Sequence, residues 1–293
     1  MRMLLTGASG FIGRNIAEQL ADRHDILAPS HHALDLTDQA AVDAFFEANA
    51  VDVVVHAAIK PGHRNAQDHT NLLDNDLRMY FNLVRNTEPR GIRLFHLGSG
   101  SCYDLRHYTP LMREEDMGRH IPADDTGFAK YVIGTHALTS AHVYDLRVFG
   151  IFGKYEDYAI RFISNALCKA LHGLPITLRQ DRLFDYVYID DFVRLLDAML
   201  DKPLAFHAYN CTAGEPTGLL ALANLAREVA QADVPILVGS DGQGLSYTGD
   251  PSRLLREFPS FAFTPQRKAV EALCDWYRTH MDTIDRSLLL TDK

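Results

Sequence analysis

Three glycines near the start of the chain have the spacing of a loop that holds phosphate groups. Gly7, Gly10 and Gly13 follow the apolar run Met3-Leu4-Leu5 and precede a helical pattern. In such a loop the first glycine permits a tight turn, the second lets backbone N–H groups approach a pyrophosphate, and the third lets the helix pack closely on its strand. The sequence therefore predicts a dinucleotide-binding site. Its expected contacts are Gly7, Ser9, Gly10, Phe11, Ile12 and Gly13.

The residues after the second apolar run favour NADP(H) as the dinucleotide. An NAD site needs a carboxylate there for the ribose hydroxyls, whereas an NADP site lacks it and supplies positive charge for the 2′-phosphate. The chain continues as Pro29-Ser30-His31-His32 without an acidic residue, and Arg14 directly follows the third glycine. We expect Arg14, Ser30 and His31 to contact the phosphate, so that NADP is preferred and NAD remains possible. If Arg14 and the histidines only face solvent, the site would not discriminate.

Alternating strand and helix patterns position these residues. Short apolar runs alternate with amphipathic segments through the first half of the chain, which is typical of right-handed βαβ units and a parallel sheet. Strands are expected at 3–5, 25–28, 51–55, 92–97, 144–148, 186–189 and 208–211. Helices are expected at 11–21, 40–48, 72–86, about 126–141, about 159–171, from 190, 219–231 and 266–280. A polar loop over 104–125 is expected to border the site.

Composition restricts the classes of partner. The 293 residues include 29 Lys and Arg against 38 Asp and Glu, a net charge of −9, which disfavours nucleic acid and anionic membranes but leaves room for a local basic pocket. The four cysteines form no C-x-x-C, which is typical of reduced thiols in a cytoplasmic protein. Neither H-E-x-x-H nor about 20 consecutive apolar residues occur, so no metal site or membrane span is predicted. We expect a small-molecule partner.

Further motifs follow the glycine loop in a fixed order. They are Asp35-Leu36-Thr37-Asp38, His56-Ala57-Ala58, the helical Asn75 and Asn82, Arg147-Val148-Phe149 and the segment 184–191, FDYVYIDD. The ordered series resembles the extended short-chain dehydrogenase/reductase family of nucleotide-sugar epimerases, dehydratases and reductases over nearly the whole chain. The resemblance implies that Asp35 and Leu36 contact adenine. It also implies that Ala57, Ala58 and Asn75 line the cofactor.

The segment after the fourth strand is most similar to that of GDP-fucose-synthase-like reductases. It reads Leu97-Gly98-Ser99-Gly100-Ser101-Cys102-Tyr103. In this position the family has a hydroxyl that hydrogen-bonds the reacting oxygen of the substrate, a role that the resemblance implies for Ser99. Alternatively, Ser99 only caps the loop at the end of the strand.

The chain departs from the family at its catalytic tyrosine. The family has Y-x-x-x-K, in which the tyrosine exchanges a proton with the sugar and the lysine binds the nicotinamide ribose. Here the segment reads Thr126-Gly127-Phe128-Ala129-Lys130, and a threonine hydroxyl is far less acidic than a phenol. Tyr131 lies about 100° round the helix, and Tyr103 or Tyr108 would serve only if the 104–125 loop folds inward. The catalytic candidates are Ser99, Thr126 and Lys130, of which Lys130 also binds the cofactor.

Two further departures concern the substrate site. The epimerising cysteine of the GDP-fucose synthases corresponds to Ser101, and their histidine acid falls near Arg161, which disfavours a two-base exchange at sugar carbons. The arginine that often holds the nucleotide phosphates corresponds to Phe184, so Arg179 or Arg182 would contact the diphosphate instead. If these arginines belong to a solvated hairpin, they make no such contact. The expected substrate-binding residues are Ser101, Arg161, Arg179 and Arg182.

The fold class expected from these patterns is α/β. It is a Rossmann-type doubly wound parallel sheet with a small C-terminal α/β substrate lobe. Residues 1–150 and about 185–215 would form the dinucleotide-binding domain. Residues about 151–184 and 216–293 would form the substrate-binding lobe.

The resemblance implies a nucleotide-sugar-modifying oxidoreductase of carbohydrate biosynthesis. A reductase of a nucleotide-4-keto sugar is favoured over an epimerase or dehydratase, and the other interpretation is a catalytically silent dinucleotide-binding homologue or an engineered active-site variant. The helices at 72–86 and 126–141 match the pair that forms a four-helix bundle between subunits in the family. They carry Met79, Phe81, Val132 and Ile133, so a homodimer is expected.

Overall fold

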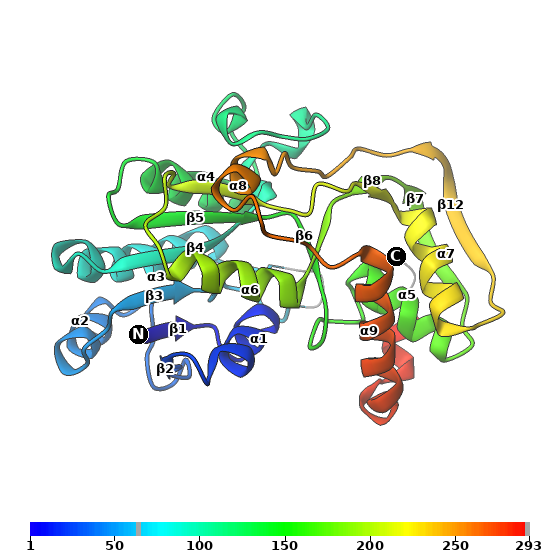
Figure 1. Cartoon of the computed structure of the whole chain (residues 1–293), viewed down its shortest axis with the longest axis horizontal. Helices are drawn as coiled ribbons and strands as arrows, with labels where there is room; N and C mark the ends of the chain where they lie inside the picture. Colours follow the sequence, from blue (N-terminus) through cyan, green and yellow to red (C-terminus); the bar gives the residue numbers. More distant parts are fainter. Residues whose placement is uncertain (63–65, 291–293) are drawn as a thin grey trace.

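A six-stranded parallel sheet forms the centre of the larger part of the protein. The computed structural model describes residues 1–62 and 66–290. The strand order is β10-β5-β4-β3-β1-β2, and every pair is parallel (Figure 1). The strands are β1 (Arg2–Thr6), β2 (Asp25–Leu27), β3 (Val53–His56), β4 (Arg93–Ser99), β5 (Val143–Val148) and β10 (Ala208–Cys211).

Helices cover both faces of this sheet because successive strand residues point to opposite sides. Met3 and Leu5 pack in one core cluster with α1 (Phe11–Leu20) and α6 (Ile189–Leu200). Leu4 packs in the cluster on the other face with α2 (Gln39–Ala48), α3 (Leu72–Thr87) and α4 (Asp125–Ala137). Strands buried on both faces read as continuous apolar runs, as residues 53–55 of β3 do. The predicted Rossmann-type doubly wound fold is confirmed.

The strand order places the candidate site. The chain moves from β1 outward to β2 and then crosses back to β3 on the other side of β1. In open parallel sheets, ligands bind at the carboxyl ends of the strands where the order reverses in this way. The loops that follow β1, β3 and β4 therefore meet at one edge, and they carry the glycine loop, Ala57-Ala58 and Ser99.

The smaller lobe, on the right in Figure 1, is built from short sheets with helices packed against them. Its strands pair as β6 (Gly150–Phe152) with β9 (Tyr186–Tyr188), β7 (Ile176–Asp181) with β12 (Ile236–Gln243), and β8 (Leu183–Phe184) with β11 (Thr217–Gly218). Helices α5 (Phe162–Leu171), α7 (Leu219–Ala230) and α9 (Gln266–Thr279) share one apolar core. The short α8 (Ser252–Glu257) returns to the main sheet, where Leu254 packs in the α1–α6 cluster. No helix in the described part of the chain is long and apolar enough to cross a membrane.

Several segments differ from the expected elements, among them short strands of the lobe and α8. Strand β12 was not expected, and seven of its eight residues are exposed. Helix α4 ends at Ala137 rather than near residue 141, because Ser140 accepts a hydrogen bond from the His142 backbone N–H and turns the chain toward β5. The polar segment 104–125 is not an open loop, since Tyr108 and Met112 are buried in a small cluster with Phe149.

Candidate active site

The glycine loop forms a backbone cradle between β1 and α1. Gly7 has a φ of +72°, and a Cβ added there would lie 2.6 Å from the backbone nitrogen of Ala58. A Cβ at Gly13 would lie 2.1 Å from the Gly7 carbonyl oxygen, so only glycine allows this approach of helix to loop. No side chain caps α1 at Gly10, which leaves its first N–H groups available to an anion. Ser9 is exposed in the loop, and Phe11 and Ile12 open the helix. The cradle fits a pyrophosphate.

The end of β3 borders the cradle. The Ala58 backbone N–H donates to Thr6 Oγ1 at 3.3 Å, and Ala57 N–H donates to the Thr6 carbonyl oxygen at 3.2 Å. These bonds hold the two alanines beside Gly7. Asn75 lies in the first turn of α3, where its side-chain amide donates to the Asn71 carbonyl oxygen at 2.7 Å.

Asp35 and Leu36 form a fixed turn between β2 and α2. The Thr37 backbone N–H and hydroxyl donate to Asp35 Oδ1 at 2.9 and 2.8 Å, and these bonds lower the pKa of the Asp35 carboxyl. The Asn82 side chain donates to the Leu36 carbonyl oxygen at 2.9 Å. The turn is thus held on both sides as a rigid edge that an adenine ring can contact.

The expected 2′-phosphate donors lie in two places. Ser30 accepts backbone hydrogen bonds from Ala33 and Leu34, and His31 and His32 are exposed with ring centroids 6.0 Å apart. Arg14 lies with its guanidinium 3.6 Å from the centroid of the Tyr155 ring. This cation–π contact ties Arg14 to the segment that follows β6.

Ser99 is the last residue of β4 and makes two contacts. Its Oγ accepts from the Ser101 backbone N–H at 3.2 Å, so it does cap the turn that follows. The same Oγ lies 3.2 Å from the hydroxyl of Tyr247, within hydrogen-bond reach. Tyr247 was not foreseen as a site residue, because it lies in a stretch before α8 that shows no regular pattern.

Lys130 is buried beneath the end of β4, with 6% of its surface exposed. Its Nζ donates to the Leu97 carbonyl oxygen at 3.1 Å and lies 3.3 Å from His96 Nε2. Burial lowers the pKa of the Lys130 ammonium, and the carboxylates of Asp76 and Asp145 act in the opposite direction.

Two buried histidines lie below Lys130, with ring centroids 5.5 Å apart. From the sequence, His56 was named only within the His56-Ala57-Ala58 motif, and His96 was not singled out. Burial, together with the charge of Lys130, lowers the pKa of His56 to about 3 and that of His96 well below its ordinary value. Both are therefore neutral, and His96 Nε2 can accept a hydrogen bond from the ammonium. The available signal was a histidine within an apolar strand. Within residues 1–62 and 66–290, no three His, Cys, Asp or Glu side chains gather as a metal site.

Thr126 lies in the first turn of α4 and is exposed. Asp124 caps this helix by accepting from the Gly127 backbone N–H at 2.8 Å, which places Lys130 one turn further on. Thr126 Oγ1 would be 3.4 Å from a Cβ added at Gly62, so the chain after β3 passes close to it. The hydroxyl at this position is accessible to a ligand.

The 104–125 segment folds inward, yet the two tyrosines considered there have other partners. Tyr103 donates to Asn210 Oδ1 at 2.8 Å and accepts from Arg147 at 2.9 Å in a buried network. Tyr108 donates weakly to the Gly100 carbonyl oxygen at 3.4 Å. Tyr131 stacks on Phe128 of its own helix. Tyr247 is the phenol in hydrogen-bond contact with Ser99.

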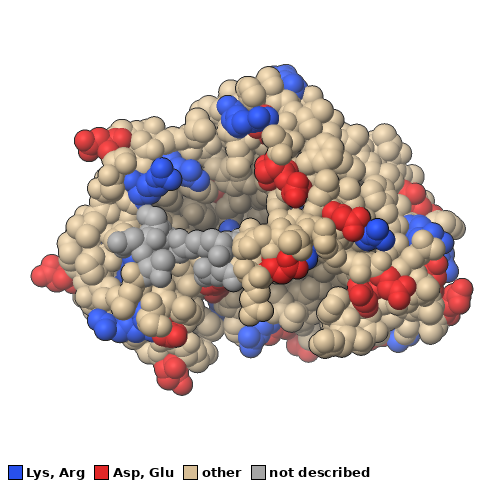
Figure 2. All heavy atoms as spheres, turned by 180° about the vertical axis from the view of Figure 1, so that it is seen from behind, with Lys and Arg blue, Asp and Glu red and all other residues tan. Residues whose placement is uncertain are grey.

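Two of the three candidate arginines, Arg161 and Arg182, act electrostatically on Tyr247. The Arg182 guanidinium lies 4.6 Å from the centroid of the Phe184 ring. Burial raises the pKa of the Tyr247 and Tyr186 phenols, and the positive charges of Arg161 and Arg182 act in the opposite direction on both. Arg179 is exposed on β7, against Gly239 of β12. Ser101 has a buried Oγ that no hydrogen bond to the described residues satisfies. Figure 2 shows that the face opposite to that of Figure 1 is hollowed near its middle, with Lys, Arg, Asp and Glu around the hollow.

The sequence pattern of one family extends over most of the chain. The sequence model of the NAD dependent epimerase/dehydratase family matches residues 3–212. The chain belongs to this family. Its members include NAD(P)-dependent nucleotide-sugar epimerases, dehydratases and reductases, and this agrees with the resemblance carried by the motifs.

Relatives over the whole length include a dTDP-glucose 4,6-dehydratase of Mycobacterium tuberculosis, 25% identical, with 95% of this chain and 93% of that protein covered. Among solved structures, a GDP-L-fucose synthetase from Naegleria fowleri bound to NADP has a TM-score of 0.80 at 16% identity and covers 96% of this chain and 95% of its own. The Bordetella bronchiseptica enzyme WbmG, in complex with NAD and UDP, has a TM-score of 0.80 at 19% identity, covering 95% and 94%. Structures of this fold thus hold NADP or NAD.

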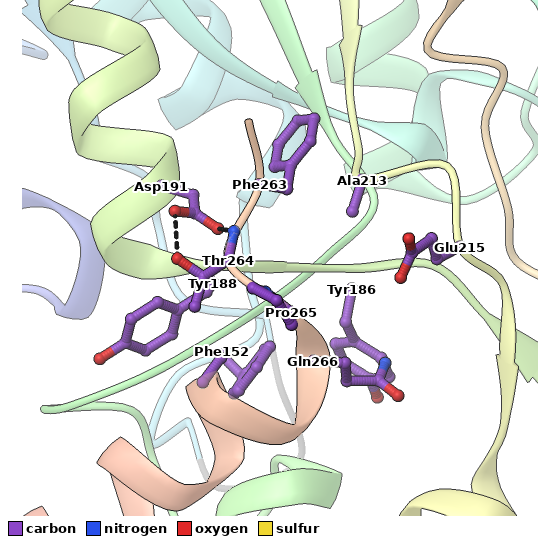
Figure 3. A pocket seen from close by; sticks show the side chains of 11 residues that line it. Phe152, Tyr186, Tyr188, Asp191, Ala213, Glu215, Phe263, Thr264, Pro265 and Gln266 are labelled. Carbon is purple, nitrogen blue, oxygen red and sulfur yellow. Dashed lines mark hydrogen bonds between the residues drawn. The ribbon is translucent and has the colours of Figure 1, made fainter. Parts of the chain in front are cut away.

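A pocket of the lobe, also missed by the sequence analysis, lies between the β6–β9 pair and the start of α9 (Figure 3). Its lining includes the aromatic residues Phe152, Tyr186 and Tyr188 and the polar residues Glu215 and Gln266. Asp191 of α6 accepts from the backbone N–H and hydroxyl of Thr264 at 2.7 and 2.8 Å, which fixes the approach to α9. Tyr186 also stacks on Phe184, which packs against Tyr247.

Proposed function

We propose that the protein is an NADP(H)-dependent reductase of a nucleotide-4-keto sugar. The observation that carries the proposal is the position of Ser99 at the end of β4, above the buried Lys130 and at the same sheet edge as the glycine loop. In parallel sheets this edge is where the ligand and the reacting groups meet. Family membership supports oxidoreduction of a nucleotide sugar as the class of chemistry. The site residues support reduction as its direction.

The cofactor site rests on the backbone cradle at Gly7 and Gly13, which a Cβ would fill. The N-terminus of α1 would hold the pyrophosphate, Asp35 and Leu36 the adenine, and Lys130 the nicotinamide ribose. When bound, the reduced nicotinamide supplies the hydride that the sugar carbonyl carbon accepts. Arg14, Ser30 and His31 would contact the 2′-phosphate, and the absence of a carboxylate at the end of β2 favours NADP(H).

The chain's own groups act on the carbonyl oxygen and on the diphosphate. The Ser99 hydroxyl donates a hydrogen bond to the carbonyl oxygen and polarises it, as oxyanion donors do. The buried Lys130 ammonium adds a positive field that stabilises charge on this oxygen. Arg161 and Arg182 neutralise the diphosphate of the substrate, and Ser101 offers its unsatisfied hydroxyl to the sugar.

Reduction suits Thr126 and Ser101 better than the other family reactions do. Oxidation of a sugar hydroxyl requires a base to remove its proton, and a threonine hydroxyl is too weak an acid to provide the anion. Proton exchange at sugar carbons is disfavoured because Ser101 stands where a cysteine would act. Reduction requires a proton donor and no base.

A second candidate function is dinucleotide binding without turnover, which the threonine at position 126 favours. Spectrophotometric assays with GDP-, dTDP- and UDP-linked 4-keto-6-deoxyhexoses distinguish the two. We expect the protein to oxidise NADPH faster than NADH with one of these sugars. Ser99→Ala and Lys130→Met should each lower this rate by about 10²-fold or more. Tight NADPH binding with no consumption on any of the three would reject the reductase and leave the binding function.

A further inference from the structure

Tyr247 is fixed against the reacting edge of the site by its backbone. Its N–H donates to the Leu183 carbonyl oxygen at 2.8 Å, and its carbonyl oxygen accepts from the Asp185 N–H at 3.2 Å. Strand β8 and the residue that follows it thus hold Tyr247 by a short parallel bridge, in which Tyr247 pairs with Phe184. A segment without regular structure of its own gains a defined position from these bonds.

The Tyr247 ring is held by aromatic neighbours on several sides. It stacks on Tyr108 at a centroid distance of 5.3 Å and packs against Phe149 at 5.3 Å and Phe184 at 5.7 Å. The close approach of Gly249 and Gly100 to Phe149, where an added Cβ would lie 2.5 and 2.7 Å from ring carbons, keeps this cluster tight. The cluster directs the phenol hydroxyl to Ser99.

The Ser99–Tyr247 contact has the geometry of a pair of donors. The two oxygens are 3.2 Å apart. An acceptor oxygen can therefore lie at an ordinary hydrogen-bond distance of about 2.7–2.8 Å from both. The other groups near the site are less suitable, because Tyr103 and Tyr108 have their own acceptors and Thr126 is a weak acid.

We propose that Tyr247 donates the proton in the reaction, in place of the tyrosine that the family has at position 126. This role rests on the proposed reductase function. Hydride from the bound dinucleotide would add to the carbonyl carbon, and the electron pair of the C=O π bond would move to the oxygen. The Tyr247 O–H bond breaks, its proton forms the new sugar O–H, and water then protonates the phenolate.

The electrostatics of the site are consistent with a donor. Burial raises the pKa of the Tyr247 phenol, so it carries its proton at neutral pH. The hydrogen bond to Ser99 lowers the pKa of this phenol and so favours release of the proton. Arg161 and Arg182, whose charges lower this pKa, would stabilise the phenolate before it is reprotonated.

The test compares Tyr247→Phe with the matched control Tyr108→Phe, since both keep their rings in the same cluster. With NADPH and the 4-keto sugar that the protein turns over, we expect Tyr247→Phe to lower kcat by about 10²-fold or more and to raise KM by no more than about fivefold. We expect Tyr108→Phe to retain kcat within about threefold. Calorimetry of the cofactor-free protein gives a second readout. Tyr247→Phe should weaken binding of the 4-keto sugar nucleotide about fivefold, which is the effect of losing one neutral hydrogen bond. Binding of the nucleotide diphosphate without the sugar should stay unchanged.

The possible failures are distinguishable. If the unmodified protein turns over the sugar and Tyr247→Phe retains its kcat, the role of Tyr247 is rejected while the reductase stands. If Tyr108→Phe loses as much kcat as Tyr247→Phe, Tyr247 has only a packing role and the proposal is overturned. The same holds if Tyr247→Phe weakens binding of the nucleotide diphosphate as much as binding of the sugar nucleotide. If the unmodified protein transfers no hydride to any of the three sugars, the reductase and the role of Tyr247 both fall.

Discussion

Lys130, His56 and His96 show how burial sets charge at the level of single residues. The ammonium lies within 3.3 Å of a histidine that cannot become protonated beside it. His56 is held by Thr6, whose hydroxyl lies 2.8 Å from its Nδ1. The two neutral histidines surround the Lys130 ammonium with polar but uncharged groups. Its positive charge can therefore act on a bound ligand.

This arrangement predicts a loss of stability in acid. Below about pH 6.5 an unfolded His56 binds a proton, whereas the folded one does not until about pH 3. The free energy of unfolding should therefore fall by about 1.4 kcal/mol per pH unit for such a histidine in this window. His96 acts in the same direction. Asp185 acts in the opposite one, because burial raises its pKa to about 6 and the folded state then holds the extra proton.

Urea unfolding between pH 7.5 and 4.5 measures the effect. We expect stability to decrease toward acid, and His56→Asn to reduce the slope by about 1.4 kcal/mol per pH unit. Equal slopes for parent and variant would show that His56 titrates alike in the folded and unfolded chains.

Single residues differ in how far the sequence could place them. Ser99 and Lys130 stand in local patterns, at a strand end and one helical turn after Thr126, and both lie at the candidate site. Tyr247 belongs to no such pattern, since bonds to Leu183 and Asp185, more than 60 residues earlier, position it. His96 was missed because a buried histidine and a surface one look the same in the sequence.

At the level of elements, the β1–α1 unit is the most strictly specified part of the cofactor site. We predict that Gly13→Ala lowers the free energy of unfolding by about 2 kcal/mol or more, because its Cβ would lie 2.1 Å from the Gly7 carbonyl oxygen. Gly10→Ala is the matched control, since its nearest contact would be 3.4 Å and we expect a loss of about 1 kcal/mol or less. Thermal or urea unfolding of the cofactor-free protein compares them. Equal losses would contradict the close-packing argument.

The elements were predictable where the local pattern agrees with the tertiary structure. The strand at 208–211 has the expected bounds, and α3 and α7 differ from expectation by one residue. Strand β12 has no alternating pattern and exists through its pairing with β7. The inward fold of 104–125 depends on Phe149 and Tyr247, which are distant in sequence.

At the scale of the whole molecule, α3 and α4 pack side by side on one face of the sheet and leave apolar side chains exposed. Phe81 is 38% exposed, and Leu138, at the end of α4, is 50% exposed. Met79 and Val132 are half-buried. Ile133 was expected to contribute to this surface, but it is buried in the core beside the sheet. We propose that this surface pairs with its copy in a homodimer, which would cover these side chains.

Light scattering at micromolar concentration tests the dimer. We expect twice the mass of the chain for the parent and the single mass for Phe81→Asp, because a carboxylate buried in the interface would be left without a partner. A parent that scatters as a single chain would contradict the proposal.

The central claim is that the site transfers a hydride to a sugar carbonyl carbon. The most direct measurement uses NADPH carrying deuterium at C4 of the nicotinamide, on the face that the protein uses, with a nucleotide-linked 4-keto-6-deoxyhexose. NMR of the product should show one deuterium at sugar C4, and Ser99→Ala should slow its appearance without changing its position. Recovery of the unlabelled keto sugar with all of the deuterium still on the nicotinamide would contradict the claim.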